Sequence, residues 1–157
     1  MIQQFPPHPL HPSDPLEKAI GRLQVESFSK LNGPYYKMFY GLDSVEERGK
    51  HFSSIIAKLG EMDEELEKSG KKFFGGSSPG MTDLMVWPWI ERIPVLDLVF
   101  PAEGLVIPGK LGKLVNWVKA MWEGVAVKQY GLSPEVHLQY RKSYDSSGVP
   151  DYDFLIK

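Results

Sequence analysis

The chain has 157 residues, 42% hydrophobic and 24% charged, which suits one ordinary globular domain with a core. Its formal net charge is −2, from 18 basic and 20 acidic residues, so it lacks a positive field that would attract nucleic acids or anionic membranes. It contains no cysteine, which excludes disulfides, a thiolate nucleophile and cysteine-ligated metals within this chain and favours a cytoplasmic location.

The N-terminal segment is rich in proline and predicts a linker or approach segment over residues 1–13. Its composition does not have the charged-then-apolar layout of a signal sequence. No part of the sequence approaches the run of ~20 apolar residues that a membrane span needs. We therefore expect the folded domain over residues 14–157, with no membrane partner.

Strong helix-start signals open this domain. Asp14 is a candidate N-cap and Pro15 occupies the first helical position. Apolar residues spaced three or four apart continue one helix face as far as Leu31. The Gly-Pro pair at 33–34 is expected to interrupt the helix, which resumes as a short aromatic helix over 35–40.

A longer helix is predicted from the capping-box pair Ser44 and Glu47 to Gly70. Acidic residues between 61 and 67 alternate with its apolar ones, and we interpret them as a solvated face. A loop is expected over 73–80, where glycine, serine and proline dominate.

The next helix, over about 81–93, is nearly all apolar and is expected to be the buried centre of the fold. Pro88 within it predicts a kink. No alternating strand pattern persists, so the predicted fold is all-α, with about six helices around this central one. The remaining helices are expected over about 110–122, 124–130 and, capped by Ser133, to about residue 144.

The sequence lacks the common catalytic constellations. His8 and His11 lie among prolines without a further ligand, so no metal site is expected. There is no serine nucleophile elbow, and the glycines of 75–80 are not followed by the lysine of a phosphate-binding loop. We therefore assign no catalytic residue to this chain.

Two residues of the central helix suggest a ligand site instead. Trp89 and Arg92 lie three apart and share a helix face. An aromatic plane beside a guanidinium suits an apolar, aromatic or anionic small molecule. The alternative is that the tryptophans are core residues and that Arg92 pairs with an acid such as Glu91 or Asp97.

The start of the central helix favours a structural role for Asp83. This residue follows Gly80 by three positions, where a carboxylate can accept a hydrogen bond from the amide of the cap residue.

Several short strings together resemble the C-terminal domain of omega-class glutathione transferases. They are the helix opening at 12–19, the FFGG loop at 73–76, Asp83 with the W-P-W-I-E-R string at 87–92, and the P-D-Y-D tail at 150–153. Their order and spacing cover nearly the whole chain, and the tryptophan-containing string is the most specific.

The resemblance implies a full-length protein in which a thioredoxin-like domain holds glutathione and the catalytic cysteine. The helical domain would wall the site for the second substrate, with Trp89, Arg92, His137, Tyr140 and Tyr144 lining it. The implied chemistry is glutathione-dependent thiol transfer, dehydroascorbate reduction and cleavage of glutathione conjugates. Glutathione is then a co-substrate of the full-length protein, and this chain binds no cofactor by itself.

Two departures from the family pattern matter. Gly80 stands where the family usually has serine or threonine, and we expect its loss of a side-chain cap to cost a few tenths of a kcal/mol. No thioredoxin-like unit precedes Asp14 and no cysteine is present, so the chain alone is expected to be inactive.

Other interpretations remain open on the sequence. The chain is either a piece of such an enzyme or a stand-alone, non-catalytic protein that holds a ligand or docks to a partner. An unrelated helical regulator or structural protein is a third hypothesis. Because the omega-class dimer draws on both domains, a homodimer is also open.

Overall fold

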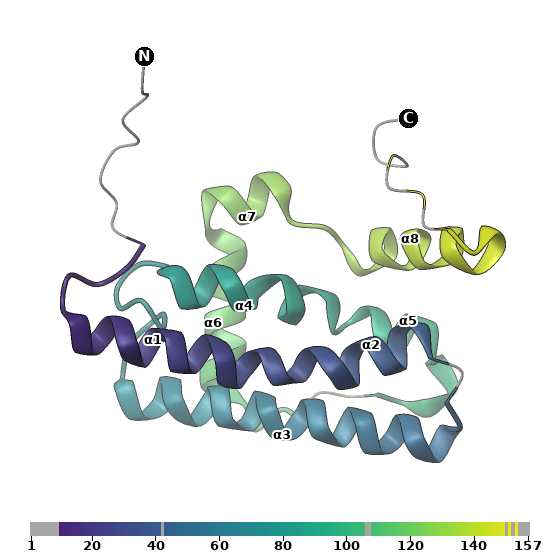
Figure 1. Ribbon diagram of the computed structural model, residues 1–157, viewed down its shortest axis with the longest axis horizontal. Coiled ribbons are helices and arrows are strands. Elements are labelled where there is room, and N and C mark those ends of the chain that lie inside the picture. The colour runs from purple at the N-terminus through teal and green to yellow at the C-terminus, as the bar shows by residue number, and fades with distance from the viewer. Residues whose placement is uncertain (1–9, 42, 106–107, 150, 152, 154–157) are drawn as a thin grey trace.

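The computed structural model describes residues 10–41, 43–105, 108–149, 151 and 153, apart from the side chains of 145–147. Within these residues the fold is all-α, as predicted. Figure 1 shows α1 and α2 running end to end between α3 and α4, with α6 crossing this layer and α8 lying over the end where α2 and α5 meet. The helices are α1 (Pro15–Phe28), α2 (Asn32–Tyr40), α3 (Val45–Ser69), α4 (Met81–Arg92), α5 (Val95–Val99), α6 (Gly112–Glu123), α7 (Val125–Tyr130) and α8 (Pro134–Ser147), with 3₁₀ turns at η1 (Ser29–Leu31) and η2 (Pro101–Glu103).

The helix start at Asp14 is confirmed, because its carboxylate accepts the amide proton of Glu17 at 2.9 Å. The predicted interruption at 33–34 is wrong. A 3₁₀ turn follows α1, and α2 begins at Asn32, so that Pro34 falls in the first turn of α2. Proline is tolerated there because the amide it lacks would have no partner within the helix.

Helix α3 has the expected ends. Ser44 and Glu47 form the capping box, with both bonds at 3.3 Å, and Gly70 ends the helix with φ 62°. One acidic residue departs from the predicted solvated face. Asp63 accepts a hydrogen bond from the amide of Leu114 at 2.7 Å, and so satisfies an otherwise unpaired donor in the first turn of α6.

Helix α4 is the central helix that its composition predicts, and it continues through Pro88 to Arg92. Trp87 is buried and its ring meets those of Trp117 and Trp122 on α6 at 5.8 and 5.3 Å. Tryptophan–tryptophan contacts of this edge-on kind stabilise a core beyond their buried area. The core hydrophobic side chains that are at most 1% exposed come from η1, α2, α3, α4, α5 and α6: Leu31, Met38, Ile55, Leu59, Met62, Leu66, Val86, Val95, Leu96, Trp117 and Met121.

Asp83 is completely buried and organises the start of α4. One carboxylate oxygen accepts hydrogen bonds from the amide of Phe74 at 2.9 Å and the indole of Trp117 at 2.7 Å. The other accepts from the amides of Gly75 and Gly80, both at 2.8 Å. The predicted bond to the Gly80 amide is therefore present, and it is one of four.

The glycine at position 80 has a steric cause that the sequence did not suggest. A Cβ atom on Gly80 would lie 2.9 Å from the Cα of Gly75, and one on Gly75 would lie 2.4 Å from the Gly80 amide nitrogen. The two backbones touch directly and leave no room for a side chain. Serine is therefore not the better cap residue at position 80, although capping preference alone ranks it above glycine. The Leu10 carbonyl closes this corner by accepting the Met81 amide at 2.8 Å.

Three features lay beyond the sequence patterns. Helix α5 and the 3₁₀ turn η2 were not predicted, and α8 extends past residue 144 to Ser147, where Gly148 ends it with φ 70°. Ser133 occupies the N-cap position of α8, but its side chain makes no capping hydrogen bond.

The predicted linker lies largely outside the described residues, as do Pro150 and Tyr152 of the predicted tail. None of the described helices combines the length and the hydrophobicity that a membrane-spanning segment requires.

Candidate functional site

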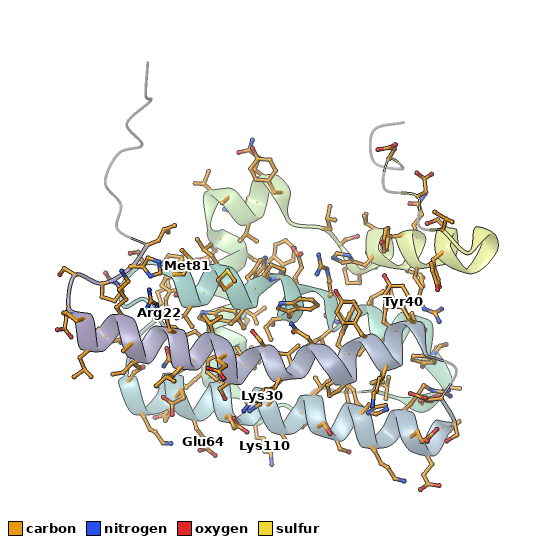
Figure 2. The ribbon with its side chains drawn as sticks, in the orientation of Figure 1. Arg22, Lys30, Tyr40, Glu64, Met81 and Lys110 are labelled. Atoms are coloured by element: carbon orange, nitrogen blue, oxygen red, sulfur yellow. The ribbon has the colours of Figure 1, made fainter. Side chains whose placement is uncertain are left out.

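A cavity of about 290 Å³ lies where α2, α4 and α8 meet. Figure 2 labels Tyr40, which extends from α2 on the side of α8. The walls are mostly aromatic, and they carry polar groups of three kinds: a guanidinium, an imidazole and phenol hydroxyls. The lining residues are Tyr35, Tyr36, Phe39, Tyr40, Trp89, Arg92, Leu132, Val136, His137 and Tyr140.

One wall is built by aromatic side chains of α2 against Trp89 of α4. The ring of Trp89 lies edge-on to Tyr35 at 6.3 Å and to Tyr36 at 5.4 Å. Tyr35 is buried whereas Tyr36 is 47% exposed, so this wall runs from the core to the surface. Burial raises the pKa of the Tyr35 phenol well above its ordinary value, and the nearby Arg92 guanidinium opposes this only in part. Tyr35 therefore presents a neutral hydroxyl.

Arg92 is the cation of the cavity. Its guanidinium lies over the Trp89 ring, 5.5 Å from the centroid. The alternative of an ion pair with Glu91 or Asp97 is not found among the described residues. Arg92 and Trp89 thus share one helix face, as their spacing predicts.

His137 enters the cavity from α8 and is 7% exposed. Its Nε2 lies 3.7 Å from Oε2 of Glu91, which is on α4, and makes no hydrogen bond. The other carboxylate oxygen of Glu91 accepts the amide of Leu132 at 3.0 Å, one residue before the cap of α8. Glu91 therefore contacts both the connection into α8 and the ring of His137.

The structure brings together four of the five residues that the resemblance assigned to a pocket. Trp89, Arg92, His137 and Tyr140 line the cavity. Tyr144 does not, but lies one turn further along α8, where its ring meets Tyr40 edge-on at 5.3 Å. Their role toward a second substrate remains a prediction.

Sequence reasoning missed the contribution of α2 and of Glu91. The aromatic residues at 35, 36, 39 and 40 recur at helical spacing, which is a signal that could have placed them on one wall. Glu91 carried no comparable signal, because its partners on the α8 side are 41 and 46 positions away along the chain.

A second, larger hollow of about 910 Å³ lies between α1 and the start of α4. Figure 2 labels Arg22 and Met81, which line it from these two helices. Large apolar side chains are exposed beside it: Ile20 and Met85 line it at 46% and 52%, and Leu16 and Leu23 flank Ile20 on α1 at 68% and 65%. Exposed apolar faces of this kind are typical of surfaces that bind another molecule.

The amino-acid sequence matches a known protein family. The family model described as "Glutathione S-transferase, C-terminal domain" matches residues 43–120, which contain α3, α4, α5 and most of α6. Groups of three or more potential metal ligands are not found in the described part of the chain. The domains of this class are all-α, as this chain is in its described residues, and the chain belongs to the glutathione S-transferase C-terminal domain family.

Within that family the chain is similar to omega-class proteins. It is 30% identical over 152 residues to glutathione S-transferase omega-1 of Mus musculus, covering 96% of this chain and 60% of that protein. It is 27% identical over 150 residues to omega-2 of Rattus norvegicus, covering 96% and 58%. It is also 30% identical over 155 residues to pyrimidodiazepine synthase of Drosophila melanogaster, covering 99% and 60%. The chain thus spans about 60% of the length of these relatives.

Proposed function

We propose that this chain provides the second-substrate side of a cytoplasmic, omega-like glutathione transferase, and that the cavity between α2, α4 and α8 receives an apolar or aromatic part of that substrate. The observation that carries the proposal is the convergence of Trp89, Arg92, His137 and Tyr140 on one cavity, although they lie on two helices far apart in sequence. Glutathione and the thiolate would come from a thioredoxin-like domain.

The cavity suits such a ligand on physical grounds. Its walls supply aromatic edges and faces from Tyr36 and Trp89, and Arg92 adds a cation that no described acid neutralises. Mostly apolar cavities with a few placed polar groups are typical of small-molecule sites.

The exposed apolar face of α1 and α4 supports the interpretation as part of a larger enzyme. A stand-alone domain gains solubility by carrying polar residues on such a face, yet Leu16 and Leu23 remain about two-thirds exposed, at 68% and 65%. A thioredoxin-like domain docked there would cover them. The alternative, a non-catalytic protein that acts alone, requires that a different partner or a second copy covers this face.

A chimera tests the proposal. The part of mouse omega-1 that precedes its match to this chain is joined to residues 1–157, and glutathione-dependent thiol transfer to an aromatic disulfide is measured. We expect no transfer by the chain alone and measurable transfer by the chimera. In the chimera, Tyr36→Ala should raise the KM for the aromatic substrate about three- to tenfold and leave the KM for glutathione unchanged, because it removes one aromatic wall.

The matched control is Tyr130→Ala, which removes an equally large ring that is 74% exposed on α7, outside the cavity. Thiol transfer by the chain alone would contradict the proposal. So would equal effects of the two tyrosine substitutions on the aromatic substrate.

A further inference from the structure

Among the described residues, Glu91 is the buried acid that contacts the lining of the cavity, through His137. Its side chain is 8% exposed, so its carboxylate has lost most of its water and needs donors from the protein. The amide of Leu132 satisfies Oε1 at 3.0 Å. The remaining oxygen, Oε2, faces Nε2 of His137 at 3.7 Å. The imidazole is thus the second donor available to this carboxylate among the described residues.

This arrangement decides which ring nitrogen of His137 carries the proton. A neutral imidazole has one N–H and one lone pair, and the environment selects the tautomer. A lone pair on Nε2 would face the lone pairs of a carboxylate, which is repulsive, whereas an N–H there is attracted even at 3.7 Å. The proton therefore belongs on Nε2, and Nδ1 keeps its lone pair.

The lone pair on Nδ1 is then the polar group that His137 offers to the cavity. Nε2 is buried on the Glu91 side, and no described group hydrogen-bonds to Nδ1. The other charged or titratable groups of the cavity are the phenols of Tyr35, Tyr36, Tyr40 and Tyr140 and the guanidinium of Arg92. The guanidinium can only donate and the phenol hydroxyls can donate or accept, so neutral His137 is the dedicated acceptor among them.

Building on the proposed function, we propose that Glu91 is a positioning residue that holds His137 in the Nε2–H tautomer, and that His137 is a specificity-determining residue whose Nδ1 accepts a hydrogen bond from an aromatic ligand. The ligand class this predicts is a ring that carries a hydroxyl, amine or amide N–H. An aromatic ether of the same shape lacks that donor and binds more weakly.

Substituting the carboxylate by an amide should invert the preference. In Glu91→Gln the single side-chain oxygen keeps the amide of Leu132, which can only donate. The NH₂ group then faces Nε2, which must become the acceptor, so the proton moves to Nδ1. The packing around Glu91 is tight, because a Cβ on Gly131 would lie 3.0 Å from Oε1, and the amide has nearly the same shape as the acid.

The test compares 2-naphthol with 2-methoxynaphthalene, which differ in the donor, by isothermal titration of the 157-residue chain at about pH 8, where an ordinary imidazole is neutral. We expect 2-naphthol to bind roughly five- to tenfold more tightly, the effect of one hydrogen bond. His137→Phe should remove this ratio, Glu91→Gln should abolish or invert it, and the exposed Glu123→Gln should leave it unchanged. Long-range ¹⁵N–¹H NMR of the histidine rings reports the tautomer directly.

The outcomes separate this inference from the proposed function. Equal binding of the two naphthalenes, or a ratio untouched by Glu91→Gln, overturns the role of His137 but leaves an aromatic cavity in place. Failure of both compounds to bind counts against the cavity itself as a ligand site. If Glu91→Gln does not fold, the wild-type NMR spectrum decides: an Nδ1–H or doubly protonated ring overturns the assignment.

Discussion

The indole Nε1 of Trp117 donates a hydrogen bond to Oδ1 of Asp83 at 2.7 Å, and both side chains are at most 1% exposed. This bond joins α6 to the first turn of α4 across 34 positions of sequence. Because the same carboxylate also accepts three backbone amides, one side chain fixes the 73–80 loop, the central helix and α6 relative to one another. The position of the cavity depends on this junction, because Trp89 and Arg92, which line the cavity, lie on the same helix α4.

Asp83→Ala should therefore be far more destabilising than the loss of a helix cap, for which about 1 kcal/mol is typical. It leaves four donors without their acceptor, and two of them, the amide of Gly80 and the indole of Trp117, are buried. We expect a loss of roughly 3–5 kcal/mol in the free energy of unfolding, measured by urea denaturation. Asp97→Ala, at an exposed position on α5, is the control and should change stability by less than about 0.5 kcal/mol. A loss below about 1 kcal/mol for Asp83→Ala would show that the carboxylate does not organise this junction.

Gly80→Ser should lower the melting temperature, although serine is a good N-cap residue. Its Cβ would come within 2.9 Å of the Gly75 Cα, so one of the two backbones must move, and the bonds to Asp83 move with it. Gly49→Ala is the opposite control. A Cβ there meets nothing within 4 Å inside α3, so this change should stabilise by about 0.5–1 kcal/mol. A higher melting temperature for Gly80→Ser would contradict the close approach of the two glycines.

Local signals account for what the sequence predicted correctly. The starts of α1 and α3 follow from Asp14 and from the pair Ser44 and Glu47, whose partners lie three residues away. The central helix follows from its composition. The contacts of Glu91 with Leu132 and His137, and the contact between the Gly75 and Gly80 backbones, depend on tertiary structure, which the periodicity of the sequence does not reveal. The predicted interruption at Pro34 was wrong because proline disrupts the interior of a helix but is tolerated in its first turn, where Pro34 lies.

Truncating Trp89 should weaken ligand binding and stability together. Trp89→Ala removes a ring that packs on Tyr35 and Tyr36 and carries the guanidinium of Arg92. We expect a loss of about 2–4 kcal/mol in stability, because Trp89 is only partly buried, and at least about a tenfold loss in affinity for 2-naphthol. Trp122→Ala, whose ring lies outside the cavity against Trp87, should cost stability but leave the affinity intact. Equal affinities in the two variants would exclude Trp89 from the ligand site.

The burial of Tyr35 should make the free energy of unfolding depend on pH in the alkaline range. Its pKa is raised in the folded chain, so the folded state disfavours the phenolate, whereas the unfolded chain ionises with a pKa of about 10. The stability due to the neutral phenol is fully present below pH ~10 and is lost as the pH rises from there toward the folded pKa. We expect Tyr35→Phe to reduce the fall in unfolding free energy between about pH 9 and pH 11, because phenylalanine has no proton to release. Tyr130→Phe, at a position 74% exposed, should leave that fall unchanged, and urea titrations at each pH measure both. If Tyr35→Phe follows the wild-type curve throughout this range, the phenol of Tyr35 is not held neutral by the walls of the cavity.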